Sequence, residues 1–135
     1  MIIGLGEDLV EISRIQKLID HQGDRFLSKC FTPTEIELSK KHTSEDRQTS
    51  SFSKRFAAKE ACLKAIGTGM REGISWQDMD IRNDDLGRPI LKVSGGVAEK
   101  LEKLTPSKLK PAIHITLSDE AGLAKATVIL EAINE

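Results

Sequence analysis

The sequence predicts an α+β protein in which a mainly antiparallel sheet packs against a long central helix. Two observations lead to this prediction. Residues 53–69 have the alanine-rich composition of a helix of about four turns, and Gly67 and Gly69 supply the left-handed backbone that ends one. The expected elements follow the order strand, helices, hairpin, helix, hairpin, so the strands pair mainly with neighbours in the chain. A length of 135 residues suits a single domain, residues 1–135.

The first part of the chain is expected to contain one strand followed by helices. Residues 1–5 are mostly apolar and predict a short strand. From Leu9 the apolar residues follow helical spacing, which predicts an amphipathic helix to about Asp20 that Gly23 closes. Residues 24–31 predict a second, short helix.

The third helix has a clear start signal. Thr32 is expected to be its N-cap, Pro33 its first residue and Glu35 the acid of a capping box. Residues 42–50 are all polar and are expected to form a mobile loop that carries Arg47. This loop would lead into the central helix.

The rest of the chain predicts two hairpins joined by a helix. Residues 76–82 and 89–93 are the expected strands of the first hairpin, with a turn at residues 83–87. Ser94 could cap a helix that reaches Leu104. The remaining expected elements are a linker loop at 105–111, an alternating strand at 113–118, a turn at 119–122 and a last strand at 123–133.

The charge is balanced overall but uneven along the chain. Twenty Lys and Arg against 21 Asp and Glu give a net charge of −1, which argues against affinity of the whole protein for nucleic acid or for an anionic membrane. Residues 40–71 contain eight Lys or Arg and three Asp or Glu. Such a local basic excess suits an anionic ligand bound at one place. Four Phe, one Trp and no Tyr also offer few aromatic rings on which bases could stack.

The sequence gives no signal for export or membrane insertion. The first residues carry no positively charged leader, and no apolar run is long enough to cross a bilayer. Cys30 and Cys62 lack metal-ligand spacing and are expected to be reduced, buried thiols. We therefore expect a cytoplasmic protein.

Two acidic residues are the strongest candidates for chemistry. Asp8 follows the first strand, and Glu60 lies in the central helix with Lys64 one turn later. Two lone carboxylates cannot cage Ca²⁺, but they suit Mg²⁺, which keeps several waters and accepts substrate phosphates. Lys54 and Arg55, upstream of Glu60, add cations that would hold the remaining phosphate charge. The sequence thus predicts a metal-bridged phosphate site, which requires that Asp8 and Glu60 meet in space.

A plain structural interpretation stays open for these charges. Charged residues at helical spacing are commonly a solvated face. Glu7 and Glu11 flank Asp8 and are expected to face solvent. His114 alternates with apolar residues and is expected to be an ordinary histidine on a sheet face rather than a catalytic group.

Four stretches of the chain together resemble one protein family. They are Gly4-Leu-Gly-Glu-Asp-Leu-Val-Glu11, Arg55-Phe-Ala-Ala-Lys-Glu-Ala-Cys-Leu-Lys-Ala-Ile-Gly-Thr-Gly69, Asn83-Asp-Asp-Leu-Gly-Arg-Pro89 and Ile115-Thr-Leu-Ser-Asp119. With these stretches the chain is similar, over essentially its whole length, to holo-[acyl-carrier-protein] synthases, the small 4′-phosphopantetheinyl transferases of fatty-acid biosynthesis. The resemblance implies transfer of 4′-phosphopantetheine from coenzyme A to a serine hydroxyl of acyl carrier protein, with release of adenosine 3′,5′-bisphosphate.

The resemblance also implies roles for individual residues. Asp8 and Glu60 would bind Mg²⁺, which also binds the pyrophosphate of coenzyme A, and Lys64 would contact that phosphate. Arg47 and Arg55 would lie near the nucleotide phosphates. The residues that would border the nucleotide are Gly67, Pro89, Ser118 and Asp119. Family members are usually homotrimers with active sites between subunits, so a homotrimer is implied here.

Cations of the N-terminal helices could bind an acidic carrier protein. Arg14, Arg25 and Lys29 could meet an acidic helix of the carrier, where charge complementarity mostly sets encounter rate and register. A solvated face is the alternative for each of the three.

Two positions depart from the family pattern. Glu7 stands where the family often has a smaller or uncharged residue, and it is either a third, water-mediated metal ligand or a solvated acid. Asp119 stands where some members carry histidine, so the general base is sought elsewhere. A metal-bound water or Glu60 would then accept the proton of the incoming serine.

Functions of other classes fit parts of the pattern. A non-catalytic module would bind an Mg²⁺–nucleotide and release no adenosine bisphosphate. An interaction protein would dock an acidic partner through residues 40–71, with an affinity that depends on salt. A transferase for large synthase carrier domains is a related alternative, but those enzymes are commonly about twice this length by duplication, and the sequence contains no repeat.

Overall fold

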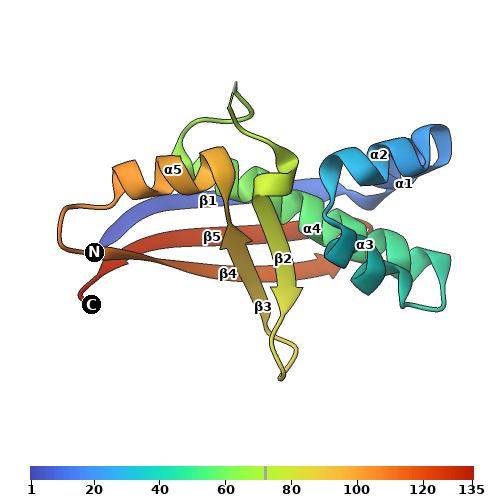
Figure 1. The fold of residues 1–135 in the computed structure, drawn as a ribbon. Helices are drawn as coiled ribbons and strands as arrows, with labels where there is room; N and C mark the ends of the chain where they lie inside the picture. Colours follow the sequence, from blue (N-terminus) through green and yellow to red (C-terminus); the bar gives the residue numbers. More distant parts are fainter. Residues whose placement is uncertain (72) are drawn as a thin grey trace.

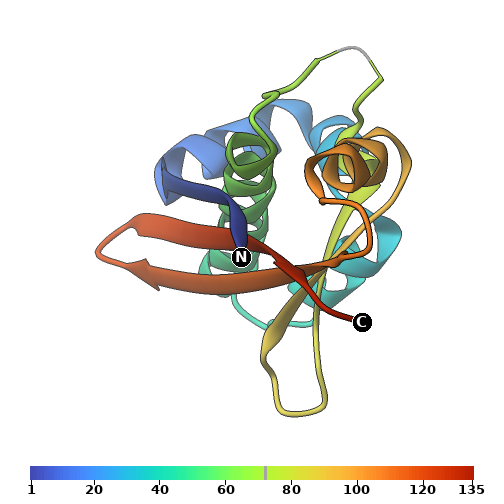
Figure 2. The ribbon, with the colours of Figure 1, turned by 90° about the vertical axis from the view of Figure 1, so that its left-hand side faces the viewer.

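A long helix lies along one face of a three-stranded antiparallel sheet (Figure 1). The computed structural model describes residues 1–71 and 73–135. Viewed end-on, the helix lies on one side of the sheet (Figure 2). This arrangement confirms the predicted α+β fold class. The helix is α4, Glu45–Ile66, and the strands, which pair in the order β1-β5-β4, are β1, Ile2–Glu11, β4, Lys110–Glu120, and β5, Leu123–Ile133.

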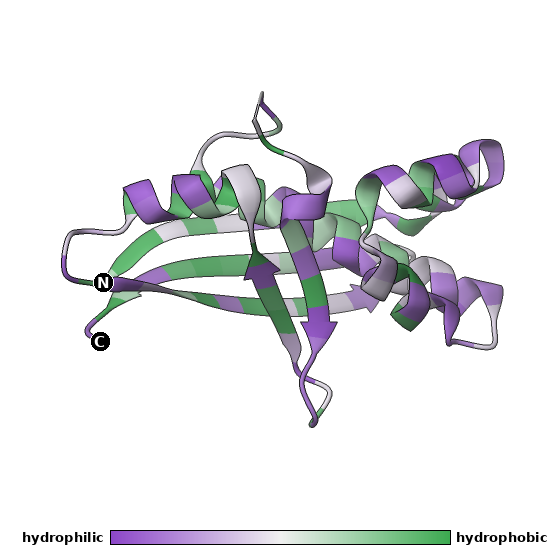
Figure 3. Ribbon diagram, viewed as in Figure 1, coloured by the Kyte–Doolittle hydropathy of each residue, from purple (hydrophilic) through white to green (hydrophobic). Residues whose placement is uncertain are grey.

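The two faces of this sheet differ in burial. On β5, Ala126, Val128 and Leu130 are completely buried on the side of α4. On the opposite side of β1, Leu5 and Leu9 are 65% and 60% exposed, so this face is open to solvent there. Figure 3 shows hydrophobic residues along the strands and hydrophilic residues on the outer turns of the helices.

A two-stranded hairpin lies beside the β4 edge of the sheet. It consists of β2, Met79–Asn83, and β3, Pro89–Val93, and β3 contacts β4. The 3₁₀ helix η1, Trp76–Asp78, precedes it, so the first predicted strand starts at Met79 and not at Trp76. The helix α5, Gly95–Leu104, follows it. The cap expected from the Ser94 side chain does not form, because Asp78 Oδ2 accepts the Gly96 N–H at 3.1 Å instead.

Three short helices precede α4, as predicted. They are α1, Ile12–Gln22, α2, Asp24–Cys30, and α3, Pro33–Lys40. The predicted capping box of α3 is confirmed: the Glu35 N–H donates to Thr32 Oγ1 at 3.2 Å, and the Thr32 N–H donates to Glu35 Oε1 at 2.8 Å.

Two predicted boundaries near these helices are wrong. β1 continues past residue 5 to Glu11, because it pairs with β5 along its whole length, and α1 therefore starts at Ile12 rather than Leu9. Helix α4 starts at Glu45, inside the predicted loop 42–50. Its start is stabilised by the Ser44 side chain, which accepts the Arg47 N–H at 3.1 Å, and by acids in the first turn.

The last hairpin is longer than predicted. β4 includes residues 110 and 111 of the expected loop and continues through Asp119 and Glu120, where a turn was expected. The ladder to β5 ends at the pair Glu120 and Leu123. The turn is formed by Ala121 and Gly122, both with positive φ (52° and 79°).

Candidate functional site

Two glycines bring β1 directly onto the backbone of α4. A Cβ at Gly4 would lie 2.4 Å from the Ala65 carbonyl oxygen, and a Cβ at Gly6 would lie 1.9 Å from that of Ala61. Neither position therefore accepts a side chain without separating the strand from the helix. The next residue of β1 on the same face is Asp8, because side chains alternate along a strand.

This approach places Asp8 beside two charged residues of α4. Lys64 Nζ donates to Asp8 Oδ1 at 3.1 Å and to the Glu7 carbonyl oxygen at 3.0 Å. Burial raises the pKa of Glu60, and the neighbouring Asp8 carboxylate raises it further, while Arg14 and Lys64 oppose the shift. Asp8 and Glu60 thus share one site, which the sequence alone left undecided.

The donor set of this site fits a magnesium ion. Two half-buried carboxylates repel each other, as the raised pKa of Glu60 indicates, and a divalent cation between them would relieve that repulsion. In the described part of the chain, no group of three or more His, Cys, Asp or Glu could enclose a metal. Mg²⁺ needs no such enclosure, since it binds through one or two carboxylates, waters and substrate phosphates.

Glu7 points away from this site. Its Oε2 accepts a hydrogen bond from Thr127 Oγ1 at 3.2 Å and lies 3.4 Å from Lys125 Nζ, both on the open face of the sheet. Glu7 is therefore a partly paired surface acid on the face opposite Asp8.

The end of α4 is as predicted. Gly67 is its C-cap with φ of 80°, and its N–H bonds to the carbonyl oxygens of Leu63 and Lys64 at 3.1 Å. The chain thus turns one residue after the last helical turn, which carries Lys64.

The other predicted site residues lie toward the opposite edge of the sheet. Pro89 is on β3, and Ser118 and Asp119 are at the end of β4, whereas Asp8 is on β1, with β5 between the two edges. Asp119 Oδ1 is paired with Lys54 Nζ at 3.1 Å. Arg47 is exposed in the first turn of α4. Within one chain the structure therefore forms two separate groups of predicted site residues.

Arg55 is buried between α4 and the hairpin. Its guanidinium donates to Ser51 Oγ at 2.7 Å, to the Ile81 carbonyl oxygen at 3.3 Å and to Asn83 Oδ1 at 3.0 Å. Burial lowers its pKa. Asn83 pairs with Pro89 across the hairpin, so Arg55 fixes the strand that carries Pro89. Asn83 belongs to a stretch that resembles the family, but its contact with Arg55 depends on tertiary packing and cannot be predicted from the sequence.

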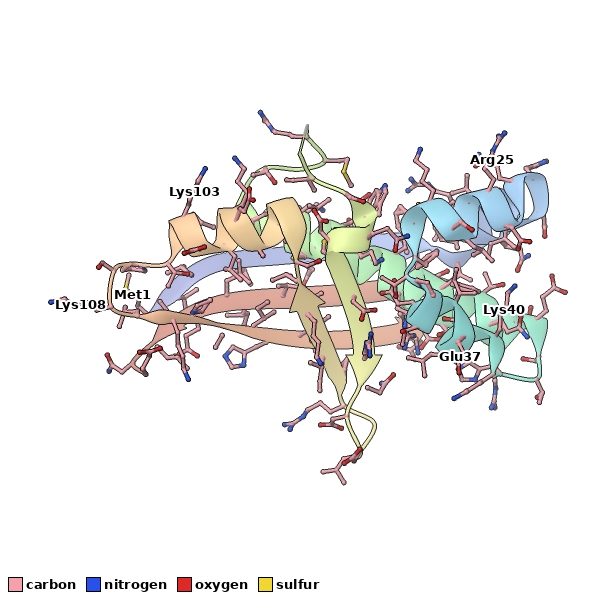
Figure 4. The ribbon with its side chains drawn as sticks, viewed as in Figure 1. Met1, Arg25, Glu37, Lys40, Lys103 and Lys108 are labelled. Atoms are coloured by element: carbon pink, nitrogen blue, oxygen red, sulfur yellow. The ribbon has the colours of Figure 1, made fainter. Side chains whose placement is uncertain are left out.

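The predicted carrier-binding cations are all exposed on the N-terminal helices. Arg14 is on α1, and Arg25 and Lys29 are on α2. Figure 4 shows the Arg25 side chain pointing outward from this end of the molecule. Arg14 differs from the other two because its guanidinium lies over the Phe56 ring of α4, 5.8 Å from the centroid.

The contacts of the two cysteines and of His114 fit structural roles. Cys30 and Cys62 are buried free thiols, as predicted, and burial raises the pKa of Cys62 to about 12. His114 Nε2 lies 2.9 Å from Glu131 Oε1, a partner supplied by β5. Among the described residues, no helix has the length and apolar character needed to cross a membrane.

Comparison with known proteins points to one family. The model of the 4′-phosphopantetheinyl transferase superfamily matches residues 4–121. The holo-[acyl-carrier-protein] synthases of Brucella ovis and Brucella melitensis are each 46% identical to the chain over 133 residues, which cover 98% of the chain and 97% of either relative.

Solved structures share the fold and about a third of the sequence. The holo-[acyl-carrier-protein] synthase of Neisseria meningitidis matches with a TM-score of 0.82 at 32% identity, covering 97% of this chain and 99% of that one. The Bacillus anthracis enzyme in complex with CoA (3′,5′-ADP) matches with a TM-score of 0.77 at 34% identity, covering 99% of each chain. The Helicobacter pylori enzyme in complex with coenzyme A gives 0.78 at 30% identity, over 94% of this chain and 99% of that one.

Proposed function

Because the chain belongs to the 4′-phosphopantetheinyl transferase superfamily, we propose that Asp8, Glu60 and Lys64 bind the pyrophosphate of coenzyme A with Mg²⁺. The activity is that of a holo-[acyl-carrier-protein] synthase acting in fatty-acid biosynthesis, and residues 1–135 serve as one transferase domain. The observation that carries the proposal is the contact of β1 with α4, which puts Asp8 beside Glu60 and Lys64.

The reaction moves phosphopantetheine from one oxygen to another. A serine Oγ of the carrier protein forms a bond to the β-phosphorus of coenzyme A, the bond from that phosphorus to the bridging oxygen breaks, and adenosine 3′,5′-bisphosphate leaves. Bound Mg²⁺ would supply charge neutralisation at the pyrophosphate. Asp8 and Glu60 are its protein ligands in this proposal, and Lys64 donates to a phosphate oxygen instead of to Asp8.

The serine proton must be accepted by a group close to the reacting phosphate. We propose Glu60 for this role, and not Asp119, because Glu60 lies beside Asp8 and Lys64. Asp119 is paired with Lys54 and lies toward the other edge of the sheet.

The second group of residues would bind the nucleotide in a neighbouring copy. Arg47, Pro89, Ser118 and Asp119 border the nucleotide in this proposal, with Gly67 on the side of Lys64, and Arg55 acts near its phosphates by holding Asn83. The two groups lie toward opposite sheet edges of one chain, so a complete site needs residues from two chains.

A homotrimer is our proposal for this assembly. The open sheet face with Leu5 and Leu9 offers apolar surface for contact between copies. Light scattering should give a mass three times that of one chain, and a Leu5→Asp, Leu9→Asp variant should dissociate. A wild-type monomer that transfers phosphopantetheine at the full rate would contradict the trimer.

The carrier would dock on the exposed cations of the N-terminal helices. Arg14, Arg25 and Lys29 face solvent and would meet the acidic helix of acyl carrier protein. We place the reaction in the cytoplasm, where the two buried free thiols would stay reduced.

Mass spectrometry of the carrier tests the function directly. Apo-carrier protein incubated with the enzyme, coenzyme A and Mg²⁺ should gain one phosphopantetheine group. Asp8→Ala and Glu60→Ala should each slow the gain by about 100-fold or more, since each removes charge stabilisation of the reacting phosphate. Glu11→Ala, which removes an exposed acid from the end of the same strand, is the matched control and should react at the normal rate.

Two outcomes would contradict the proposal. Folded Asp8→Ala and Glu60→Ala variants with normal turnover would show that the assigned roles are wrong. Binding of coenzyme A without any release of adenosine bisphosphate would favour the non-catalytic module.

A further inference from the structure

Strand β1 has one edge to which no other strand of the described chain is paired. It lies at the end of the sheet order β1-β5-β4, and among residues 1–71 and 73–135 it pairs only with β5 (Figure 1). In an antiparallel pair, every second residue directs both of its backbone groups at the partner strand, and the residues between direct theirs away. The outward groups of an edge strand can bind another extended chain.

The hydrogen bonds at the end of β1 show which of its residues point outward. The Ile12 N–H, directly after the strand, donates to the Gly122 carbonyl oxygen at 2.9 Å. The register of the ladder continues from this pair, so the even-numbered residues of β1 from 4 to 10 direct their N–H and C=O groups at β5. The backbone groups of Leu5, Glu7 and Leu9 therefore point away from β5.

This outward edge begins at the proposed phosphate site. Lys64 Nζ donates to the Glu7 carbonyl oxygen at 3.0 Å, as an outward carbonyl allows, and to Asp8 Oδ1 at 3.1 Å. If a phosphate oxygen replaces Asp8 at Lys64, the phosphate and the edge of β1 share one lysine. The next outward groups toward the N-terminus are the Glu7 N–H and then the Leu5 carbonyl oxygen. Both residues are exposed, so the edge is open to a ligand.

We propose that the pantetheine arm of coenzyme A binds along this edge of β1 as a strand-like chain. The Glu7 N–H would donate to the carbonyl of its first amide, and the Leu5 carbonyl oxygen would accept the N–H of its second amide. This inference deepens the proposed function and rests on it for the position of the phosphate. The arm fits the edge chemically because it is an extended chain with two secondary amides. It runs toward Leu5, since beyond Leu9 the strand leads into α1, where the carrier is proposed to dock.

The backbone of Glu7, and not its side chain, would recognise the arm. The Glu7 carboxylate lies on the open face of the sheet, with Thr127 Oγ1 at 3.2 Å and Lys125 Nζ at 3.4 Å. Loss of the N–H should therefore differ in effect from loss of the side chain. Proline has no N–H and is tolerated on edge strands where that group points away from the neighbouring strand. Glu7→Pro and Glu7→Ala thus form a matched pair.

Calorimetric titration with two ligands in the presence of Mg²⁺ isolates the contribution of the arm. Coenzyme A and adenosine 3′-phosphate 5′-diphosphate share the nucleotide and the pyrophosphate, but only coenzyme A has the arm. Wild type should bind coenzyme A about tenfold more tightly, as expected from two added hydrogen bonds. Glu7→Pro should reduce this preference to about twofold, because one bond is lost and its neighbour is weakened. Glu7→Ala should keep the full preference.

Two controls separate this effect from a general disturbance of β1. Glu7→Pro should keep the wild-type affinity for adenosine 3′-phosphate 5′-diphosphate, which reports on the phosphate site alone. Glu11→Pro places a proline at the end of the same strand, where φ is already −74°, and should keep the full preference for coenzyme A.

A modified ligand tests the same edge with wild-type protein. In a coenzyme A analogue whose second amide is replaced by an ester, the N–H that would donate to Leu5 is missing. This analogue should bind about fivefold more weakly than coenzyme A. Equal affinity would overturn the inference, even if Glu7→Pro does not fold.

Other outcomes would also contradict this role of the β1 edge. They are an undiminished preference for coenzyme A in Glu7→Pro, and an equal loss of preference in Glu7→Ala, which would assign the effect to the side chain. A changed mass of Glu7→Pro in light scattering would show that the edge pairs with another copy of the chain instead. If wild type does not bind adenosine 3′-phosphate 5′-diphosphate, the phosphate site and the proposed function are wrong. If it binds this ligand with no preference for coenzyme A, only the role of the edge is wrong.

Discussion

Two of the ion pairs that helix α4 forms differ in burial and in the number of their hydrogen-bond partners. Lys59 Nζ lies 2.6 Å from Glu35 Oε1 of α3, and both side chains are 0% exposed. Lys64 Nζ lies 3.1 Å from Asp8 Oδ1 of β1, and these side chains are 56% and 17% exposed. Each pair joins a lysine to a carboxylate, so the surroundings decide what each pair does.

The buried pair is fully bonded. Glu35 accepts from the N–H groups of Thr32 and Ile81 as well as from Lys59. Lys59 also donates to the carbonyl oxygens of Cys30 and Trp76, at 2.7 and 3.1 Å. The network joins α2, α3, β2 and α4, and it leaves no charge available to a ligand.

The exposed pair, by contrast, has a second acid next to it. Glu60 lies near Asp8, and its pKa is raised by burial and by that like charge. Mutual repulsion of two acids costs stability unless a ligand relieves it, and this is a common feature of functional sites. The comparison teaches that complete hydrogen bonding distinguishes the structural pair, and that repulsion between neighbouring acids distinguishes the pair of the proposed site.

The largest expected effect separates the two lysines by their contribution to stability. Lys59→Ala leaves Glu35 charged and buried without its partner, so the free energy of unfolding should fall by about 3–5 kcal/mol. Lys64→Ala removes a lysine that is mostly exposed and should cost about 0–1 kcal/mol. Urea unfolding of metal-free protein, at one protein concentration because the enzyme is proposed to be oligomeric, measures both.

Equal losses of unfolding free energy in Lys59→Ala and Lys64→Ala would contradict the distinction between the two pairs. A small loss in Lys59→Ala would show that water reaches Glu35 and that the pair is not structural. A large loss in Lys64→Ala would assign the exposed pair a structural role as well.

The next effect tests how the exposed site is assembled. In Gly6→Ala the new methyl group would meet the Ala61 carbonyl oxygen, so β1 must move away from α4. We expect a stability loss of about 1–3 kcal/mol, together with weaker Mg²⁺ binding because Asp8 moves away from Glu60. Urea unfolding and calorimetry measure the two quantities.

Glu7→Ala is the control for this variant. It changes the adjacent residue of β1 on the open face and should keep the wild-type Mg²⁺ affinity. Weaker Mg²⁺ binding in Glu7→Ala would support the alternative in which Glu7 is a water-mediated metal ligand. Unchanged Mg²⁺ binding in Gly6→Ala would show that the glycine contact does not position Asp8.

Much of the fold could be predicted from local patterns. The α3 capping box of Thr32 and Glu35 and the C-cap at Gly67 depend on neighbouring residues only, and both are confirmed. The boundaries that were wrong depend on distant partners. The polar residues after 42 resemble a loop until the Ser44 cap is recognised, and the end of β1 is set by its pairing with β5.

The candidate site also has a part that local sequence predicts and a part that depends on distant contacts. Residue types and the family resemblance predict Asp8, Glu60 and Lys64 as site residues. Their proximity follows from the Gly4 and Gly6 contacts, which no spacing in the sequence specifies. Gly-x-Gly in a strand that faces a helix is the signal that could have shown it. The sequence does not predict the pairing of Lys59 with Glu35, because charged residues are expected at the surface, although Lys59 directly follows Ala57 and Ala58.

The smallest effect measures the repulsion at the exposed site itself. Since burial and Asp8 raise the pKa of Glu60, the folded protein holds this proton more strongly than the unfolded chain. The resulting stabilisation is present below the pKa of an unfolded glutamate and is lost as the pH rises through the folded pKa. Carboxyl NMR titration of metal-free protein should show a lower Glu60 pKa in Asp8→Asn, which removes one of the two causes. Arg14→Ala should move the same pKa upward, because Arg14 lowers it. If neither variant moves the Glu60 pKa, the three charges do not share one site, and the contrast with the Glu35–Lys59 pair disappears.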